Sequence, residues 1–460
     1  MLELIARALE DRSARGIAAA VSRLVTSGQL AAGTRLPTVR AVARQLGISP
    51  TTVSEAWGSL TQAGVIQTRG RSGTFVLTIE RPRQRLRYAQ LTASPATLPT
   101  DLSTGVPDHD LLPSLAAALR RIGDARLTTS YLDEPVLPHL EAVLRERWPY
   151  PPEQLTIVDG ALDALDRITA ATVRFGAHVL VENPTFPPVL DLLETVGAIA
   201  VGVAMDADGV RPDALADALA CRPAAFFLQP RAHNPTGVST TPARAGELAA
   251  VLARHPDAGD VVVVEDDHAG DIATAAPVSI GHELPGRTVH IRSFSKSHGP
   301  DLRLAAIGGP ANLISAVADR RLLGPGWSSR LLQAVLFDLL TTPSTVDQVA
   351  AAREEYARRR TELRTELAAR GVHASADDGI NLWLAVADQQ AAMLSLAAHG
   401  IAVAPGAPFE VAPLGTEYIR VTVGLVRDGF GALAEVLAEA ASGPAPTTGR
   451  RQAIMARGAR

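Results

Sequence analysis

The chain has 460 residues, 47% of them hydrophobic, and a formal net charge of −4, which predicts a globular protein of two or three folding units. Its one cysteine, Cys221, excludes an internal disulfide and a multi-cysteine metal site, and we expect no metal site at all. No apolar run approaches the roughly 20 residues of a membrane helix and no secretory signal opens the chain, so we expect a cytoplasmic protein without membrane contact.

The first 90 residues are strongly basic. They hold 13 arginines and 5 acidic residues, whereas acidic residues are in excess in the rest of the chain. A basic first domain followed by an acidic remainder indicates that the first domain binds a polyanion, although a solvated linker accounts for the positive charge equally well.

A helix-turn-helix pattern follows the first predicted helix, Arg12–Thr26. Thr38 can cap a second helix that ends at Gly47, and Ser49 with Pro50 opens a third. The second helix of such a pair enters the major groove of DNA by its N-terminal residues. The segment VIQTRGRSGTFVL then predicts two strands around a basic hairpin that suits phosphate contact.

The run from Gly28 to Val76 resembles the GntR-type winged helix, a family that reads DNA operators as dimers. The resemblance implies that double-stranded operator DNA is the partner, and that the contacts come from Arg40, Ser49, Thr51, Thr52, Arg69 and Arg71, with Gly73 shaping the wing. A winged helix used for protein contacts is the alternative. We therefore expect a winged helix at residues 1–77 and a linker at 78–100.

From about Asp101 the pattern changes to short apolar runs that alternate with alanine-rich helices, which is typical of an α/β domain. The clusters QPRAHNPTG, EDDHAG and RSFSK each follow one of the predicted strands. Ligands of open α/β sheets gather beyond the carboxyl ends of strands, so we expect these clusters to converge. The predicted strands are His178–Val181, Ala198–Val203, Ala225–Leu228, Val261–Val264 and Val289–Ile291.

Lysine occurs once, at Lys296, and every other basic residue is an arginine. A guanidinium does not form the usual imine with a carbonyl, so Lys296 is a candidate for covalent chemistry, with chance retention as the alternative. The nearby clusters suit pyridoxal 5'-phosphate (PLP), with Lys296 for the Schiff base and Asp266 or Asp267 for the pyridine nitrogen. The other candidates are Asn234 for the phenolic oxygen, Phe186 for ring stacking, and Ser293, Ser295, Arg303, Gly160 and Ala161 for the phosphate.

These stretches resemble the class I aminotransferase-like domain of fold type I over roughly residues 100–440, with HNPTG and SFSKSHGPDLRL as the most specific segments. The resemblance places the pyridine partner on Asp266 and implies that Arg420, in EYIRVTVGL, binds the carboxylate of an amino compound. Joined to the winged helix, this domain resembles the MocR subgroup of GntR regulators. Members usually form head-to-tail homodimers and respond to PLP or to an amino compound that reacts with it.

The expected α/β fold is a winged helix followed by a fold type I PLP domain at 101–440. Its large subdomain, with a mostly parallel sheet, is expected at about 130–315 and a smaller α/β subdomain at about 316–440. Residues 441–460 are expected to form a disordered basic tail.

Two positions depart from the family pattern. His268 stands where the family usually has a tyrosine that donates to the phenolic oxygen; histidine can also donate, but it titrates near neutrality. At the phosphate helix, Leu162 removes a polar side chain, and Asp159 and Asp163 would repel the phosphate if they face it. Each lost hydrogen bond would cost roughly 1 kcal/mol, so we expect PLP binding to survive in weakened form.

The sequence therefore predicts a DNA-binding transcription regulator whose aminotransferase-like domain binds PLP through Lys296 and senses an amino compound or PLP itself, without efficient turnover. A working aminotransferase with a DNA-binding appendage and a regulator that has lost the cofactor are the alternatives. Production of a keto acid would favour the first alternative, and a protein that stays colourless with PLP would favour the second.

Overall fold

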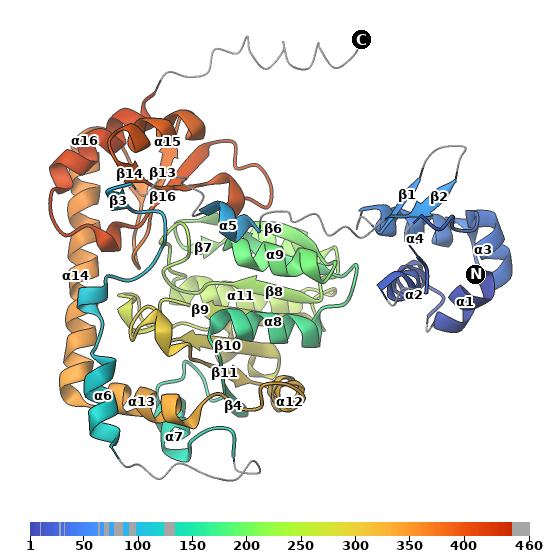
Figure 1. Ribbon diagram of the computed structural model, residues 1–460, viewed down its shortest axis with the longest axis horizontal. Coiled ribbons are helices and arrows are strands. Elements are labelled where there is room, and N and C mark those ends of the chain that lie inside the picture. Colours follow the sequence, from blue (N-terminus) through green and yellow to red (C-terminus); the bar gives the residue numbers. More distant parts are fainter. Residues whose placement is uncertain are drawn as a thin grey trace. The chain divides into compact units, whose positions relative to one another are not determined.

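A computed structural model of the chain describes residues 1–9, 11–26, 29–31, 33–62, 65–68, 73–77, 86–91, 98–123 and 134–443. The chain divides into two units, the first consisting mainly of Met1–Leu86 and the second beginning at Arg87 (Figure 1).

The first unit is a winged helix. Helix α3 (Val39–Leu46) begins at Thr38, whose hydroxyl accepts a hydrogen bond from the Ala41 amide at 3.2 Å, and it ends at Gly47, which has a φ of 67°. The apolar faces of the helices pack around Trp57 in one core. The sequence pattern predicted the three helices that follow residue 12, but it did not predict the first helix, α1. The other elements are α1 (Leu2–Ala8), α2 (Ala14–Thr26), α4 (Pro50–Gln62), β1 (Ile66–Thr68) and β2 (Thr74–Val76), the two strands pairing antiparallel.

An eight-stranded sheet lies at the centre of the second unit, in the order β4-β11-β10-β9-β8-β5-β6-β7. Strands β5, β8, β9 and β10 run parallel, as predicted, whereas β11 is antiparallel to both β10 and β4. The sheet is therefore mixed, and the predicted strands are present with bounds shifted by a few residues. The bounds are β4 (Gln154–Val158), β5 (His178–Asn183), β6 (Ile199–Asp206), β7 (Gly209–Val210), β8 (Ala225–Leu228), β9 (Val262–Asp267), β10 (Thr288–Ser293) and β11 (Ala305–Gly309).

Amphipathic helices flank this sheet (Figure 1). Helix α11 is typical: Thr241 caps it, Pro242 occupies its first turn, and Ala245, Leu248, Ala249 and Leu252 form its buried face at helical spacing. The helices of this part are α6 (Leu115–Ile122), α7 (Pro138–Glu146), α8 (Ala161–Thr172), α9 (Pro187–Thr195), α10 (Pro212–Leu219), α11 (Pro242–Arg254), α12 (Ala311–Leu322) and α13 (Arg330–Thr341).

A smaller subdomain is built on the four-stranded sheet β12-β13-β16-β15, and β14 pairs in parallel with β3. The 26-residue helix α14 runs along one side of the unit and joins the two subdomains (Figure 1). The bounds are β3 (Thr100–Asp101), α14 (Pro343–Ala368), β12 (Ala374–Ser375), β13 (Leu382–Val386), α15 (Gln389–Ala398), β14 (Ile401–Ala402), β15 (Ala404–Pro405), β16 (Glu417–Val421) and α16 (Phe430–Ala441).

The subdomain boundary differs from the expected residue 316. Helix α13 buries Leu336 and Leu339 in the core of the large subdomain, so the change of subdomain falls within α14. At the other end, Leu102 packs in the core of the small subdomain. The predicted linker also contains a helix, α5 (Arg87–Leu91), whose Leu91 packs against Trp383.

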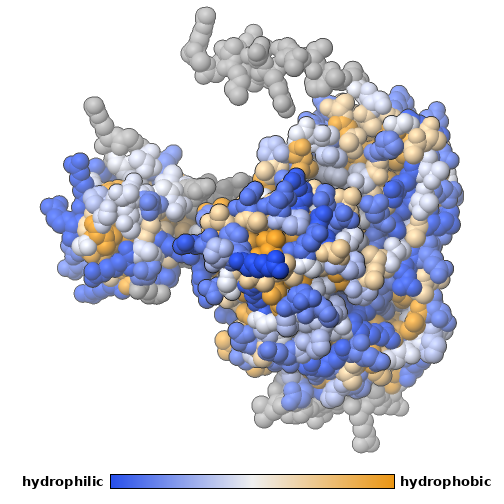
Figure 2. Space-filling model, turned by 180° about the vertical axis from the view of Figure 1, so that it is seen from behind, coloured by the Kyte–Doolittle hydropathy of each residue, from blue (hydrophilic) through white to orange (hydrophobic). Residues whose placement is uncertain are grey.

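No helix in the described ranges is long and apolar enough to cross a membrane. Hydrophilic residues dominate the face shown in Figure 2, and apolar residues there form small scattered groups.

Candidate cofactor-binding site

Asp266 lies near the end of β9, and its carboxylate is buried. The Gln229 side-chain amide donates to Oδ2 at 2.8 Å, whereas Oδ1 has no hydrogen-bond partner among the described residues. Burial raises the pKa of Asp266 to about 6 against the effect of the Gln229 hydrogen bond, and the charges of Asp267 and Glu182 add to the rise. A buried acceptor oxygen without a donor fits a protonated pyridine nitrogen.

Asp267, which the sequence left as the alternative, is engaged elsewhere. Its carboxylate pairs with the buried guanidinium of Arg231 at 2.5 Å. Successive residues of a strand point to opposite faces of a sheet, so Asp266 and Asp267 serve different faces. The structure thus favours Asp266, and it identifies Gln229, which sequence reasoning missed, as the residue that orients it.

Lys296 lies in the turn after β10, and its Nζ donates to the carbonyl oxygen of Gly105. Burial lowers the pKa of Lys296 to about 8; the positive charge of Arg420 lowers it further, and Asp266 opposes the shift. The neutral amine, which is the form that attacks an aldehyde, is therefore more abundant near neutral pH than in an ordinary lysine.

Arg420 projects from β16 and is 2% exposed. Its Nη1 donates to the side-chain oxygen of Asn234 at 3.1 Å, and its Nη2 donates to the carbonyl oxygen of Ser103. Burial lowers the pKa of Arg420 to about 10, so it remains a cation at neutral pH. A buried guanidinium with two parallel donors suits a carboxylate.

Asn234 is held in place from three sides. Its backbone amide donates to the Gln229 side-chain oxygen at 2.8 Å, and its own side-chain oxygen accepts from Arg420 and, at 3.4 Å, from Asn381. Because that oxygen is already used, the side-chain NH₂ of Asn234 is the group left to donate to a phenolic oxygen.

The predicted phosphate residues lie at two places. Gly160 immediately precedes α8 and has a φ of 101°; a Cβ there would come within 3.0 Å of the Arg303 guanidinium, which donates to the Asp159 carbonyl at 3.1 Å. Ser293 accepts a hydrogen bond from the Ser295 amide at 3.3 Å. Ala161 is the first residue of α8, whose N-terminal amides suit an anion.

Arg321, which the sequence analysis did not identify, neutralises the acidic residues Asp159 and Asp163 at the start of α8. Arg321 is 2% exposed and pairs with Asp163 at 2.5 Å and with Asp159 at 3.0 Å. The Ser328 hydroxyl donates to Asp159 at 2.6 Å as well. These contacts remove most of the repulsion expected for a phosphate, while Leu162 is 40% exposed.

His268 forms a hydrogen bond through Nε2 with the Ala232 carbonyl at 2.9 Å. A carbonyl only accepts, so Nε2 carries the proton. Burial, together with the charge of Lys296, lowers the pKa of His268 to about 4, so the ring is neutral and Nδ1 has no proton to donate. The donor expected at this position is therefore already used. Phe186, the stacking candidate, is half-buried just before α9.

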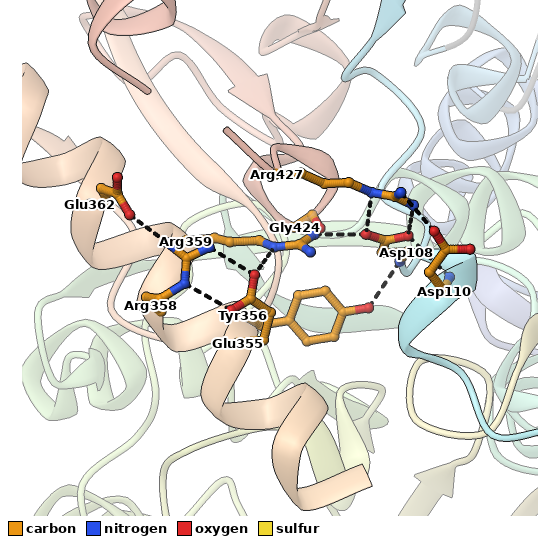
Figure 3. A network of polar contacts seen from close by, with 9 residues as sticks. All are labelled: Asp108, Asp110, Glu355, Tyr356, Arg358, Arg359, Glu362, Gly424 and Arg427. Atoms are coloured by element: carbon orange, nitrogen blue, oxygen red, sulfur yellow. Dashed lines mark hydrogen bonds and ion pairs between the residues drawn. The ribbon is translucent and has the colours of Figure 1, made fainter. Parts of the chain in front are cut away.

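The segment Ser103–Asp110 joins the site to helix α14, and Figure 3 shows its end at Asp108 and Asp110. The carbonyls of Ser103 and Gly105 hold Arg420 and Lys296, as described above. Further along, the buried carboxylate of Asp108 accepts from Arg359 at 2.8 Å and from Arg427 at 2.6 Å.

Two other contacts complete this anchor. The Asp108 backbone amide donates to the Tyr356 hydroxyl at 2.9 Å, and Arg359 donates to the Gly424 carbonyl at 2.5 Å (Figure 3). A segment that contacts both candidate site cations is thus fixed to α14 and to the small subdomain. Sequence reasoning found none of these residues.

The predicted DNA-contacting residues of the helices lie at the surface of the first unit. Arg40 on α3 and Thr51 on α4 are exposed, and Thr52 is half-buried. Ser49 is exposed, and its hydroxyl accepts from the Thr51 amide at 3.1 Å at the start of α4.

In the wing, Gly73 has a φ of 107°, and a Cβ there would come within 2.7 Å of the Arg35 guanidinium. This geometry requires glycine and agrees with its expected role in shaping the wing. Arg69 and Arg71 lie outside the described residues, as do most of the predicted C-terminal tail and most of the predicted linker.

Two family models match the chain. Residues 13–76 match the bacterial regulatory proteins of the gntR family, and residues 99–437 match the aminotransferases of class I and II. Together they span both units.

Proteins of known name resemble the chain over most of its length. The vitamin B6 salvage pathway transcriptional repressor PtsJ of Salmonella typhimurium is 34% identical, over 91% of this chain and 96% of its own. The probable rhizopine catabolism regulatory protein MocR of Rhizobium meliloti is 27% identical, over 73% of each chain.

Among solved structures, LysN, an α-aminoadipate aminotransferase of Thermus thermophilus complexed with N-(5'-phosphopyridoxyl)-L-leucine, has a TM-score of 0.66 and 22% identity. The match covers 74% of this chain and 91% of that chain, and it shows the fold of the second unit.

Proposed function

We infer the function of this chain from its family, because it belongs to the MocR-type GntR regulators, in which a winged helix precedes an aminotransferase-like domain. It is a DNA-binding transcription regulator, and PLP is the cofactor of its second domain. We propose that Lys296 holds this cofactor covalently and that the domain senses an amino compound or PLP itself.

One observation carries the proposal for the site. The chain has one lysine, and its half-buried amine lies within electrostatic reach of Asp266, whose Oδ1 has no partner among the described residues, and of Arg420. A partly desolvated amine, an unsatisfied carboxylate and a buried guanidinium all cost free energy unless a ligand uses them. No requirement of folding brings these three groups together.

Each of these side chains has a distinct part in binding. PLP supplies an aldehyde that reacts reversibly with amines and a ring that withdraws electrons. The Asp266 carboxylate accepts from the protonated ring nitrogen, and Asn234 donates through its NH₂ group. Arg303 and the amides at Gly160 and Ala161 bind the phosphate, with Ser293 and Ser295 as further donors.

The effector is proposed to bind through Arg420. A carboxylate-bearing amine would replace the Ser103 carbonyl as the acceptor for Nη2, while its amino group would replace Lys296 as the partner of the cofactor. The Gly105 carbonyl remains to accept a hydrogen bond from the released Lys296 amine. Both exchanges act on the segment that Asp108 fixes to α14, which gives a physical route from ligand binding to a rearrangement of the subdomains.

A regulator is favoured over an efficient enzyme by His268. In the family, the residue at this position donates to the phenolic oxygen of the cofactor, whereas the His268 proton is committed to the Ala232 carbonyl. The name of the Salmonella relative, a repressor of vitamin B6 salvage, supports PLP itself as one effector of this chain. We also propose a head-to-tail homodimer that works in the cytoplasm, on the strength of the family resemblance.

The experiment is a visible absorbance spectrum of the full chain with PLP, before and after borohydride, followed by peptide mass analysis. The expected result is a coloured species that borohydride fixes on Lys296. Lys296→Arg is the matched control, because it keeps the positive charge and cannot form the bond. DNA binding, followed by fluorescence anisotropy with a labelled duplex, should respond to PLP in the wild type and not in this variant.

A protein that stays colourless, or one that is labelled equally in the wild type and in Lys296→Arg, would contradict the assignment. Steady production of a keto acid from an amino acid at many turnovers per minute would favour the enzyme instead.

A further inference from the structure

A cavity of about 390 Å³ lies on the far face of the central sheet from Asp266. Asp267 lines it at the end of β9, and Arg292 lines it from β10. Since Asp266 and Asp267 are consecutive strand residues, their side chains leave opposite faces of the sheet. The cavity is therefore separate from the candidate cofactor site.

Four guanidinium groups line this cavity, those of Arg147, Arg231, Arg292 and Arg353. They outnumber the carboxylates in the lining, which are Asp267 and Asp271. Such a concentration of like charge around a space of ligand size is unfavourable unless an anion shares it.

The buried pair of arginines is already neutralised. Arg231 contacts Asp267 at 2.5 Å and donates to the Ala275 carbonyl at 2.9 Å, and Arg292 contacts Asp271 at 2.5 Å. Burial alone would raise the pKa of Asp271, but the charge of Arg292, together with the smaller effects of His298 and Arg231, outweighs it and holds that pKa below its usual value. These two ion pairs leave the buried side of the cavity without net charge.

The other two arginines supply the excess charge. Arg147 follows α7 and donates to the Leu340 carbonyl at 3.2 Å, and Arg353 projects from α14. Neither has a carboxylate partner in the part of the chain that the structure describes, so two positive charges are unpaired among these residues.

An apolar space adjoins the charged one. It has a volume of about 140 Å³ and shares Arg147, Asp271 and Arg353 with the larger cavity, while Leu339, Leu340 and Val349 supply its apolar wall. A ligand that fits both spaces has an anionic end and a small apolar group.

We propose that this cavity is a second ligand site, which binds a small organic dianion, a phosphate monoester or a dicarboxylate, between Arg147 and Arg353. Two guanidiniums match the two charges, and each can bind acidic oxygens with paired donors. The adjoining apolar space selects an anion that carries a small ring or short chain. A ligand there would link α14 to the ends of β9 and β10.

The test uses the full chain with PLP fixed by borohydride, so that the phosphate region of the cofactor site is filled. Phenyl phosphate and benzylmalonate, a dicarboxylate with a similar ring, are titrated by calorimetry at constant ionic strength. Inorganic phosphate shows whether the apolar space contributes. We expect one bound ligand per chain for at least one of the two organic dianions, bound at least threefold more tightly than inorganic phosphate.

Arg353→Gln and Arg147→Gln should each weaken that binding about tenfold or more, because each removes a charge-assisted hydrogen bond. Arg147 is exposed and Arg353 is half-buried, and neither has a carboxylate partner among the described residues, so the variants should fold. Arg254→Gln, an exposed arginine of α11, is the matched control and should bind as the wild type does.

Absence of binding by either dianion at millimolar concentration would overturn the proposal, as would equal binding by the wild type and both cavity variants. Failure of borohydride to fix PLP would count against the proposed role of Lys296 and not against the second site. The second site is tested separately, because its ligand binding must depend on Arg147 and Arg353.

Discussion

Asp108→Asn tests the anchor between the candidate site and helix α14. The change keeps the shape of the side chain and one acceptor oxygen, but it removes the negative charge that faces Arg359 and Arg427. The Arg359 pair matters most, because the side chains of Arg359 and Asp108 are only 5% and 3% exposed and their atoms lie 2.8 Å apart.

The expected loss follows from that burial. Charge-assisted hydrogen bonds contribute about 1.5–3 kcal/mol each, and breaking a buried ion pair costs about 3–5 kcal/mol. Arg359 keeps a second partner, Glu355, at 2.7 Å, which reduces the loss. We therefore expect Asp108→Asn to lower the free energy of unfolding of the second unit by about 2–3 kcal/mol.

Asp110→Asn is the matched control. Asp110 pairs with the same Arg427 at 2.6 Å, but the two side chains are 64% and 54% exposed. Solvent-exposed ion pairs contribute about 0–1 kcal/mol, so this variant should lose at most that amount.

The assay is urea unfolding followed by tryptophan fluorescence in a Trp57→Phe background, because the other three tryptophans lie in the second unit. Burial alone would raise the pKa of Asp108, but the hydrogen bonds from Arg427 and Arg359 outweigh it and lower that pKa. A lowered pKa adds stability that is present above the unfolded value of about 4 and lost as the pH falls through the folded value. The difference in the free energy of unfolding between the wild type and Asp108→Asn should therefore become smaller at acidic pH. A loss no larger than that of Asp110→Asn, or one that does not change with pH, would refute this reasoning.

Three further predictions concern the two binding regions. The rate at which PLP attaches to the apo chain should rise with pH and level off above about pH 8, because the pKa of Lys296 is lowered to about 8; a rate that climbs steadily toward pH 10 in stopped-flow absorbance would contradict this. Asp266→Asn should weaken PLP binding at neutral pH about tenfold or more in a spectral titration, because it removes a charged acceptor from a buried site, whereas an unchanged Kd would exclude Asp266 as the ring-nitrogen partner. Arg40→Gln should weaken binding to DNA of any sequence and reduce the magnitude of the slope of log affinity against log salt concentration by about 1. Arg120→Gln, an exposed arginine of α6, is the control. If the two variants have the same slope, Arg40 does not contact a phosphate.

The sequence predicted the fold because its evidence is local. Thr38, Gly47, Ser49 and Pro50 set the ends of two helices through contacts within a few residues, and such contacts are visible in the order of the amino acids. The parallel strands were predicted for a similar reason, since apolar runs alternate with helices. The antiparallel β11 was missed, because its pairing with β10 and β4 depends on packing at the far edge of the sheet.

The principal candidate residues of the site were also proposed from the sequence. Lys296 is conspicuous because every other basic residue is an arginine, and Asp266 and Asn234 follow apolar runs that the sequence predicted as strands. Chemistry restricts an imine-forming amine and a pyridine partner to few residue types, so their identity alone is informative.

What only the tertiary structure decided is which charges and amides meet. Asp108 and Arg359 are 251 positions apart, and Gln229 reaches Asp266 across 37. The chain has many arginines, and their positions in the sequence do not show which of them form ion pairs. Only the structure shows that Arg321 neutralises Asp159 and Asp163, and that Arg147 and Arg353 lack such a partner among the described residues. A hydrogen bond or buried ion pair requires approach to about 3 Å, and that distance is set by the packing of whole helices and strands rather than by local sequence.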